Sequence, residues 1–303
     1  MTILLLGGGG FIGKALWKPL FDAGHSFRVL SRRAEPELFP RDPLKATWQS
    51  GDIADPEALA SAMQGVEIVV HLAGPASPAR SQNDWTSDVQ AQVLNSIAVL
   101  ECMRANNVRR LVFLSSGGTV YGRCQAFPID EDQATNPIST HGINKLAAEK
   151  HVGLCRHLGW LDPVVLRVAN AYGPGQPLKR EQGIIGTVID AAISGQAVRI
   201  WGDGSAVRDF IYVDDVAGAI LAAIERPGVL GTFNIGSGEG RSIRQVIAEL
   251  ESILGKAVQV EYLPGRPLDV PYNVLDTARA RRELEWTPGT GFREGLSATV
   301  AAW

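Results

Sequence analysis

The fold is indicated first by the segment Ile3-Leu4-Leu5-Leu6-Gly7-Gly8-Gly9-Gly10-Phe11-Ile12-Gly13. The four aliphatic residues predict a buried strand, and residues 11–23 have the apolar spacing of a helix. Glycine lets a phosphate approach the backbone N–H groups at the start of that helix, and Gly13 lets the helix pack against the strand. The segment therefore predicts a dinucleotide site, with a glycine-rich turn that binds no ligand as the alternative.

Composition narrows the class of protein. The 303 residues include 29 basic and 32 acidic side chains, which give a formal net charge of -3, and 45% of the residues are apolar. This excludes a disordered or fibrous chain, and the absence of a basic excess argues against a nucleic acid partner. Three scattered cysteines predict neither a disulfide framework nor a metal site. With no signal peptide and no apolar run near the roughly 20 residues of a membrane span, we expect a cytoplasmic protein that acts on small molecules.

Short apolar runs alternate with helical segments along the first half of the chain. Strands are expected at residues 3–6, 27–30, 68–71, 111–114 and 164–168, and helices at 11–23, 56–63, 89–106 and 145–157. This alternation predicts an α/β fold with a Rossmann-type doubly wound parallel sheet. After residue 168 the pattern loosens into turns, a helix at 183–193 and a strand at 198–201, which indicates a smaller, interleaved C-terminal lobe.

These patterns predict two domains. The dinucleotide-binding domain is expected at residues 1–168, joined by part of 209–235, because the helix expected at 213–224 could return to the sheet. The substrate lobe is expected to take up most of residues 169–303.

The residues after the second expected strand bear on the choice of cofactor. An acidic residue at this place hydrogen-bonds the adenosine ribose, whereas an arginine accommodates a 2′-phosphate. The chain has Ser31-Arg32-Arg33 here. We therefore favour NADP(H) and keep NAD(H) as the alternative.

Motifs spread from Gly7 to about Gly295 resemble the extended short-chain dehydrogenase/reductases, in particular their nucleotide-sugar epimerase/dehydratase family. Besides the glycine segment they are Ser-Ser-Gly-Gly-Thr-Val-Tyr-Gly at 115–122, His-Gly-Ile-Asn-Lys at 141–145, Arg-Val-Ala-Asn-Ala-Tyr-Gly-Pro-Gly-Gln at 167–176 and Val-Arg-Asp-Phe-Ile-Tyr-Val-Asp-Asp-Val at 207–216. The resemblance implies an adenine contact by the acid after Gly51 and a strand end beneath the cofactor at residues 71–74. The residues expected at the cofactor are Gly7, Gly10, Phe11, Ile12, Gly13, Ser31, Arg32, Arg33, Asp52, Ile53, Leu72, Ala73, Gly74 and Lys145.

The resemblance also implies the catalytic residues. In the family a Ser or Thr, a Tyr and a Lys four residues after the Tyr act together: the Tyr moves the hydroxyl proton, and the Lys lowers the Tyr pKa and holds the ribose. Residues four apart project from one helix face. Lys145 matches the Lys, but His141 stands where the family has Tyr, and Gly117 stands where it has the Ser or Thr.

The departures change which residues are expected to act. Thr119 or Ser116 is then the hydroxyl for the substrate oxygen. An imidazole can act as acid or base because its ordinary pKa of about 6.5 lies near the operating pH, so we expect His141 to replace the tyrosine. The alternative is an exposed helix-start histidine in a protein of weak or lost activity. Gln92, where the family has Asn, is a further departure.

The second half of the chain supplies the expected substrate contacts. The resemblance implies that Asn170, Arg208 and Arg266 contact a nucleotide diphosphate, and a guanidinium suits phosphate oxygens. An ion pair with a neighbouring aspartate, 209 or 214, is the alternative for Arg208. Trp201 is either a contact to the nucleobase or a core residue.

The reaction expected first is C4 epimerisation of a nucleotide-sugar, with a UDP-sugar favoured, by transient hydride transfer to a bound nicotinamide cofactor. The alternatives are an NADPH-dependent 4-keto-sugar reductase and a non-catalytic nucleotide-sugar or NADP(H) binding relative that has lost the tyrosine. A dehydratase is disfavoured because Gly118-Thr119 replaces the Asp-Glu pair of those relatives. The family also implies a homodimer through the helices at 89–106 and 145–157.

Overall fold

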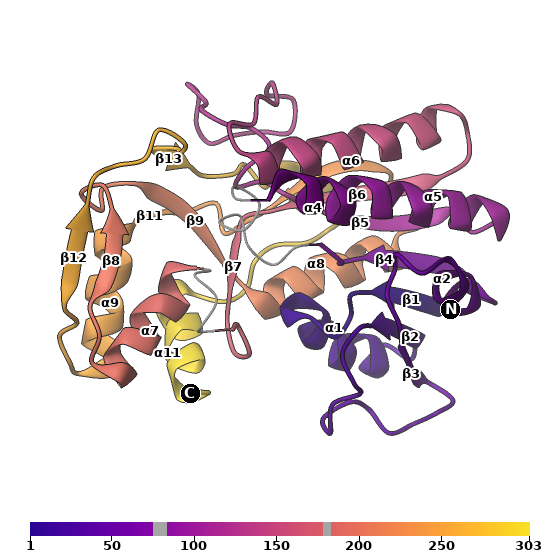
Figure 1. The fold of residues 1–303 in the computed structure, drawn as a ribbon, viewed down its shortest axis with the longest axis horizontal. Coiled ribbons are helices and arrows are strands. Elements are labelled where there is room, and N and C mark those ends of the chain that lie inside the picture. The colour runs from indigo at the N-terminus through magenta and orange to yellow at the C-terminus, as the bar shows by residue number, and fades with distance from the viewer. Residues whose placement is uncertain (75–83, 178–182) are drawn as a thin grey trace.

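A seven-stranded parallel sheet forms the centre of the computed structural model, which describes residues 1–74, 84–177 and 183–303 (Figure 1). The strand order is β10-β6-β5-β4-β1-β2-β3. The strands are β1 (Thr2–Leu6), β2 (Ser26–Ser31), β3 (Ala46–Ser50), β4 (Ile68–His71), β5 (Arg110–Ser116), β6 (Asp162–Val168) and β10 (Gly231–Ile235). This order is that of a doubly wound sheet and confirms the expected Rossmann-type fold.

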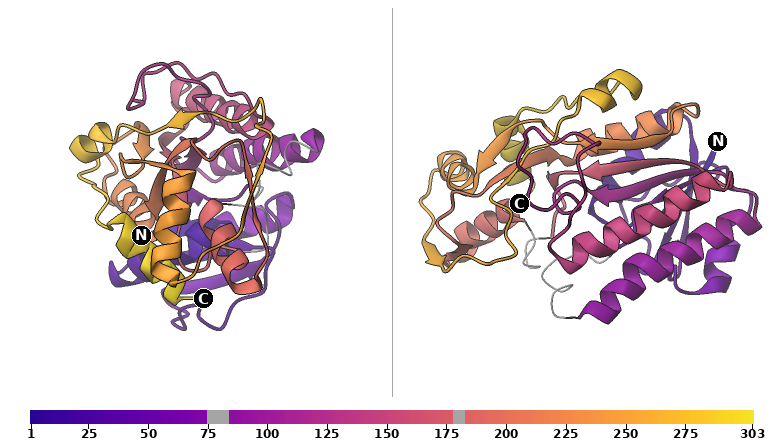
Figure 2. Two further views of the ribbon diagram at one scale, coloured as in Figure 1. Left: turned by 90° about the vertical axis from the view of Figure 1, so that its left-hand side faces the viewer. Right: turned by 90° about the horizontal axis from the view of Figure 1, so that it is seen from above.

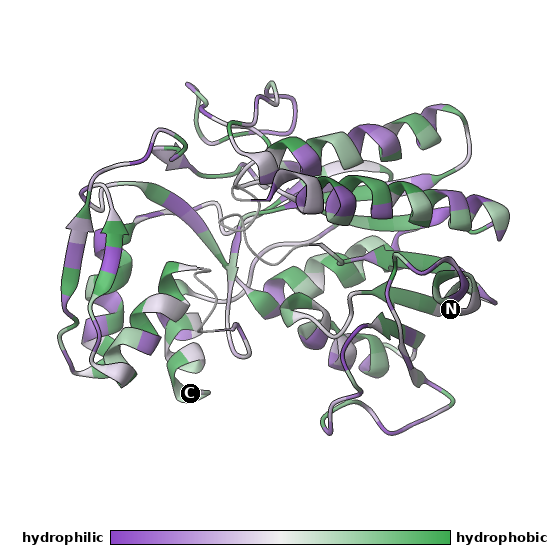
Figure 3. Cartoon of the chain, in the orientation of Figure 1, coloured by the Kyte–Doolittle hydropathy of each residue, from purple (hydrophilic) through white to green (hydrophobic). Residues whose placement is uncertain are grey.

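Helices cover both faces of the sheet (Figures 1 and 2). One core contains side chains from α1 (Phe11–Asp22), α8 (Val213–Glu225) and α10 (Ala278–Glu283). The other contains side chains from α2 (Pro56–Met63), α5 (Asn95–Ala105) and α6 (Thr140–His157). The central strands are buried on both sides, which explains why β1, β4 and β5 are nearly continuous runs of apolar residues (Figure 3).

Two strands of the sheet were not anticipated by the sequence patterns. β3 is an edge strand with the sequence Ala-Thr-Trp-Gln-Ser, and most of its side chains are only partly buried, so its apolar signal is weak. β10 lies beside β6 although 62 residues separate the end of β6 from its start, and it joins the sheet through pairing that no local pattern reveals. The expected helix at 89–106 is also wrong in detail. It consists of α4 (Trp85–Val89), a π-helical turn η1 (Gln90–Leu94) and α5.

The smaller lobe lies at the other end of the molecule and is built from the second half of the chain (Figure 1). Its elements are β7 (Asn170–Tyr172), α7 (Ile184–Ser194), β8 (Val198–Trp201), β9 (Val207–Tyr212), β11 (Gly240–Ser242), α9 (Ile243–Leu254), β12 (Val260–Leu263), β13 (Tyr272–Asn273) and α11 (Phe292–Ala301). Because α8 and β10 pack with the large sheet, the chain passes between the two regions more than once. A division of domains at residue 168 stays a prediction.

The register of the sheet determines where the site is. Leu6 pairs with His71, and His71 pairs with Phe113, so β1 and β4 end at the same level and β5 continues three residues further, to Ser116. In open α/β sheets ligands bind outside these carboxyl ends. Among the described residues, no helix has the length and apolar content needed to cross a membrane.

Candidate active site

The glycine segment forms a tight turn between β1 and α1. Gly7 has a φ of +80°, and a Cβ there would lie 2.9 Å from Ala73 Cα. A Cβ on Gly13 would lie 2.4 Å from the carbonyl oxygen of Gly8, so the start of α1 packs directly against the turn. Both positions require glycine for reasons of space, and Gly7 also requires it for its backbone angle.

The start of α1 fits the pyrophosphate of a dinucleotide. Gly10 is the N-cap of the 12-residue helix, and no side chain caps it. The first N–H groups of a helix, here from Phe11, Ile12 and Gly13, lack partners within the helix and attract an anion together with the helix dipole. The pyrophosphate requires free N–H donors that it can approach closely. The glycine turn supplies them, because it leads from a central strand into a helix whose start has no side-chain cap.

Of the two arginines after β2, Arg33 contacts this turn and Arg32 lies near Asp52. Arg33 donates a hydrogen bond to the carbonyl oxygen of Gly9 at 3.1 Å, and its backbone N–H donates to Ser31 Oγ at 3.3 Å. Arg32 lies 3.7 Å from the carboxylate of Asp52 and is largely exposed. Ser31, Arg32, Arg33 and Asp52 are therefore gathered at one corner, where the adenosine half of a dinucleotide would lie.

Asp52 does not cap the helix that follows it. That helix, α2, is capped by Asp55, which accepts hydrogen bonds from the N–H groups of Glu57 and Ala58. Asp52 accepts from Ala54 N–H at 3.0 Å, and Ile53 is partly buried against the core of that face. The Asp52 carboxylate is therefore not used as the cap of α2.

The strand end after β4 borders the expected lysine. Leu72 and Ala73 pack against the two cores of the sheet, one on each face. A Cβ on Gly74 would lie 3.4 Å from Lys145 Nζ. This places the Lys145 amine directly beside the chain that leaves β4.

Lys145 is partly buried at the carboxyl end of β5. Its Nζ donates to the carbonyl oxygen of Leu114 at 3.1 Å and lies 5.5 Å from the centre of the Phe113 ring. Burial lowers the pKa of Lys145 to about 8, although Glu149 and Asp88 oppose this effect. The amine therefore loses its charge within the pH range in which enzymes commonly act.

His141 lies one turn before Lys145 and is also buried, with 9% of its surface exposed. The helix begins here because Ser139 caps it by accepting from Gly142 N–H. Burial and, to a lesser extent, the charge of Lys145 lower the pKa of His141 to about 4, while Asp88 opposes them. His141 is neutral at physiological pH, and the alternative of an exposed helix-start histidine is wrong.

Gln92 contacts the imidazole and links it to two further buried side chains, Asp88 and Asn144. Gln92 Nε2 lies 3.2 Å from His141 Nδ1 and 2.7 Å from Asp88 Oδ2. Asn144 Nδ2 donates to the same Asp88 oxygen at 2.7 Å. The sequence patterns noted Gln92 only as a departure and missed Asp88 and Asn144. Asp88 lies on α4 and Gln92 on η1, which follows it directly. Their four-residue spacing could have linked them if the expected helix had begun before residue 89.

The hydroxyl groups expected at the substrate oxygen lie at the end of β5, where Ser116 is the last residue, and on the segment that follows, which contains Thr119. Thr119 Oγ1 is buried and has no hydrogen-bond partner among the described residues. A Cβ on Gly118 would lie 3.9 Å from Ser116 Oγ and 3.8 Å from Asn170 Oδ1. At Gly117 a Cβ would lie 2.8 Å from the carbonyl oxygen of Arg167 and 2.5 Å from Leu275, so this backbone has no room for a Ser or Thr there.

The expected substrate residues come from different elements of the smaller lobe. Asn170, on β7, donates to the carbonyl oxygen of Asp209 at 2.9 Å. Arg208, on β9, donates to its neighbour's carbonyl, and burial lowers its pKa, with Asp269 opposing and Arg266 adding to the effect. Asp269 was not anticipated as a partner.

Arg266 and Trp201 are in contact. The guanidinium carbon of Arg266 lies 5.0 Å from the centre of the Trp201 ring, and its nitrogens bind the Asp269 carboxylate at 3.0 and 3.1 Å. Trp201 is 46% exposed and is therefore not a core residue. Two guanidinium groups and an exposed indole thus lie near one another, a set that suits an anionic aromatic ligand.

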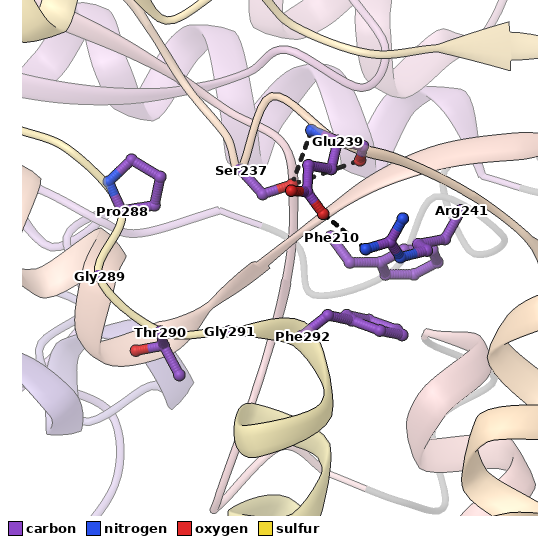
Figure 4. A pocket seen from close by; sticks show the side chains of 9 residues that line it. All are labelled: Phe210, Ser237, Glu239, Arg241, Pro288, Gly289, Thr290, Gly291 and Phe292. Atoms are coloured by element: carbon purple, nitrogen blue, oxygen red, sulfur yellow. Dashed lines mark hydrogen bonds and ion pairs between the residues drawn. The ribbon is translucent and has the colours of Figure 1, made fainter.

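A separate cavity of about 230 Å³ lies in the smaller lobe (Figure 4). Its lining includes Arg241, which pairs with Glu239 and lies 5.5 Å from the centre of the Phe292 ring. None of the residues expected at the cofactor, the catalytic group or the substrate lines it. The candidate site is therefore defined by the side chains that come together at the carboxyl ends of the central strands, and not by this cavity.

Comparisons with known proteins agree with this arrangement. A model of the NAD dependent epimerase/dehydratase family matches residues 3–236. The UDP-glucose 4-epimerase of Mycolicibacterium smegmatis is 34% identical over 305 residues, which cover 99% of this chain and 97% of that protein.

Two solved structures are similar over their whole length. The UDP-glucose 4-epimerase of Thermotoga maritima with UDP-glucose is 34% identical and has a TM-score of 0.91, and the match covers 100% of this chain and 98% of that one. The UDP-glucose 4-epimerase of Thermus thermophilus in complex with NAD is 31% identical, with the same TM-score and coverage.

Proposed function

Since this chain belongs to the NAD dependent epimerase/dehydratase family, we propose that it is an enzyme that inverts C4 of a UDP-sugar by using a bound nicotinamide cofactor. The observation that carries the proposal is the position of His141 and Lys145. They lie one turn apart on α6, and Lys145 Nζ is hydrogen-bonded at the end of β5 and adjoins the strand end after β4. Groups that act on a sugar beside a nicotinamide ring must lie at the carboxyl ends of the strands, where the cofactor binds in this type of sheet.

In the proposed reaction, different residues bind the substrate, orient its 4-oxygen and transfer its proton. When bound, the nicotinamide cofactor supplies reversible hydride acceptance. Thr119 and Ser116 provide hydroxyl groups that orient the 4-oxygen of the sugar, and Lys145 supplies the cation. His141 takes the place of the tyrosine as the proton-handling group at that oxygen.

Substrate selection falls to the smaller lobe. Arg208 and Arg266 would hold the diphosphate, because guanidinium groups bind phosphate oxygens in pairs of hydrogen bonds. Asn170 lies close to the Gly118 segment and would bridge the diphosphate and the reacting sugar. The exposed ring of Trp201 would contact the nucleobase.

An assay by NMR tests the proposed reaction. Purified protein is incubated with UDP-, dTDP- and GDP-sugars, each with NAD+, NADP+ or NADPH, and the stereochemistry at C4 is followed. The proposal predicts a C4 epimer from a UDP-sugar with no net consumption of cofactor. Binding of UDP-sugars without any turnover would contradict it and favour a non-catalytic binding protein.

A 4-keto-sugar reductase is the second candidate, and Arg32 and Arg33 favour it. Net reduction draws on NADPH. Arg33 contacts the glycine turn and Arg32 lies near Asp52, at the corner where a 2′-phosphate would need a cation. Stoichiometric loss of NADPH with a 4-keto-sugar, and no epimer from the 4-hydroxy sugar, would establish this reaction instead.

The same two residues underlie a preference for NADP(H) over NAD(H). Calorimetry with both oxidised cofactors measures it directly, and tighter binding of NADP+ is expected. Equal or tighter binding of NAD+ would overturn the preference.

We further propose that the protein is a homodimer through α5 and α6, which run side by side on one face (Figure 2). Leu154 and Leu158, on and just after α6, are about half exposed, as expected for a surface that a second copy covers. Light scattering tests the dimer: a particle with twice the mass of one chain is expected, and a particle with the mass of one chain would contradict it.

A further inference from the structure

An asparagine of the smaller lobe holds the backbone at the end of β5. Asn273 Nδ2 donates a hydrogen bond to the carbonyl oxygen of Gly117 at 3.1 Å, although the two residues are 156 positions apart in the sequence. The N–H of Gly117 donates to the carbonyl oxygen of Val168 at 2.8 Å. Both backbone polar groups of Gly117 therefore have partners, and the carbonyl is held from the smaller lobe.

The Asn273 side chain is buried, and its amide can face only one way. The residue is 1% exposed. A carbonyl oxygen only accepts hydrogen bonds, so the nitrogen of the amide must face Gly117. The amide oxygen, Oδ1, is buried without a hydrogen-bond partner among the described residues. Since an unpaired buried oxygen costs free energy, packing alone does not explain an asparagine at this position, whereas the hydrogen bond to Gly117 does.

The backbone that Asn273 holds carries the two hydroxyl groups expected at the sugar. The N–H groups of Thr119 and Val120 both donate to the carbonyl oxygen of Ser116, at 3.2 and 3.1 Å. Residues 116–120 therefore form one tight turn. A shift of the backbone within this turn would move the hydroxyl groups of Ser116 and Thr119 with it.

Asn273 also lies beside the residue expected to bind the diphosphate. Strand β13 pairs in parallel with β9, and Asn273 is the register partner of Arg208. Two residues further along, Leu275 N–H donates to Asp209 Oδ2 at 3.3 Å, and Leu275 Cδ1 lies 2.5 Å from the place of a Cβ on Gly117. One short segment thus contacts both β9 and the backbone at the end of β5.

We propose that Asn273 is a positioning residue whose amide sets where the turn at 116–120 lies relative to a diphosphate bound at Arg208. The hydroxyl groups of Ser116 and Thr119 are thereby held where the 4-oxygen of the sugar lies. This inference rests on the proposed function, which places a UDP-sugar between these groups. Asn273 acts through the backbone and not on the reacting atoms, and a misplacement of about 1 Å can lower a rate about a hundredfold.

Hydrogen exchange measured by mass spectrometry tests this role without any turnover. Asn273→Leu removes the amide at similar volume, and the N–H groups of residues 117–120 are expected to exchange about fivefold faster than in the wild-type protein. That factor is the change in the opening equilibrium when one buried hydrogen bond is lost. If the leucine variant does not fold, Asn273→Ala carries the test.

Tyr272→Phe is the matched control. It removes a hydroxyl from the neighbouring position of β13, and successive side chains of a strand point to opposite faces. Tyr272 is 38% exposed, and its ring packs against Phe127. The exchange at residues 117–120 should therefore be unchanged in this variant.

Added UDP tests the connection to the diphosphate. In the wild-type protein UDP is expected to slow exchange at residues 117–120. In Asn273→Leu this effect should be lost, while the Kd of UDP by calorimetry stays within about threefold because Arg208 and Arg266 are intact. An effect of UDP that survives in the variant, or that is absent from a wild-type protein that binds UDP, would overturn the connection.

Turnover provides the last readout. Asn273→Leu is expected to lower kcat at least about tenfold with little change in KM, because the turn acts on orientation and not on diphosphate binding, and Tyr272→Phe should keep both values. Equal exchange at residues 117–120 in wild type and variant, or a kcat within about threefold of wild type, contradicts the positioning role. A failure of the proposed function looks different. The wild-type protein would then turn over no UDP-sugar, and faster exchange in Asn273→Leu without ligand would still support the hold on the turn.

Discussion

Burial sets the properties of the two residues at the centre of the site. The pKa of His141 is lowered to about 4 and that of Lys145 to about 8, and desolvation is the main cause of both shifts. Between these values the histidine is neutral and the lysine is charged. We therefore expect the imidazole to act in its uncharged form, next to a cation that stabilises negative charge on the substrate oxygen.

Replacement of His141 separates an active site from a lost one. We expect His141→Ala to lower turnover on the true substrate by about a hundredfold or more, as for other proton-handling groups. His141→Tyr should also lose activity, because the surroundings are built around an imidazole. A loss of less than about threefold in the alanine variant would mean that His141 has no such role, and a large gain in the tyrosine variant would identify an impaired relative.

The pH dependence of kcat/KM follows from the two shifted groups. We expect a plateau from about pH 5.5 to about pH 7.5, since proton-handling groups act in one protonation state. The rate should then fall as pH rises through about 8, where Lys145 loses its charge. Lys145→Arg should move that fall upward if it folds and turns over, because arginine stays charged. A fall in rate on acidification with a midpoint near the ordinary histidine pKa would contradict a buried His141.

At the scale of single elements, the sequence predicts most where a local rule applies. The strand, glycine turn and helix at residues 3–22 are specified by a buried run, a close backbone approach and an open helix start, and each leaves a pattern in the sequence. β3 and the π-helical turn leave none, since an edge strand has mixed exposure and the irregular turn depends on tertiary packing. The partner of His141 was missed for the same reason, because 49 residues separate it from Gln92.

The glycine turn offers a direct test at this scale. Gly13→Ala places a Cβ 2.4 Å from the Gly8 carbonyl oxygen, and backbone atoms cannot move aside cheaply. We expect a loss of roughly 1 to 3 kcal/mol in the free energy of unfolding by urea, as for other overpacked sites, and weaker cofactor binding. Gly153→Ala is the control, since nothing lies within 4 Å of its Cβ in the exposed part of α6, and it should be neutral or stabilising. Equal stability and cofactor affinity in both variants would refute this account of the turn.

At the scale of the whole molecule, the site depends on residues from both halves of the chain. Asn170 and Arg208 come from the smaller lobe, whereas His141 and Lys145 lie on α6, which packs on the large sheet. The Asn170 amide lies near the Gly118 segment that follows β5. The family resemblance predicted each of these residues separately and did not predict the interactions between them. It did not predict that Asp269 and Arg266 act on the pKa of Arg208, because they lie nearly 60 positions from Arg208 in the sequence and only the fold brings the charges close.

The central claim is that hydride leaves C4 and returns to the same carbon. The most direct measurement uses the UDP-sugar that the NMR assay identifies as substrate, deuterated at C4, with the protein in ordinary water. The account predicts that the C4 epimer forms and keeps its deuterium at C4, because the label leaves and returns without exchange. An epimer that has lost its deuterium to water would contradict hydride transfer and require removal of a C4 proton instead.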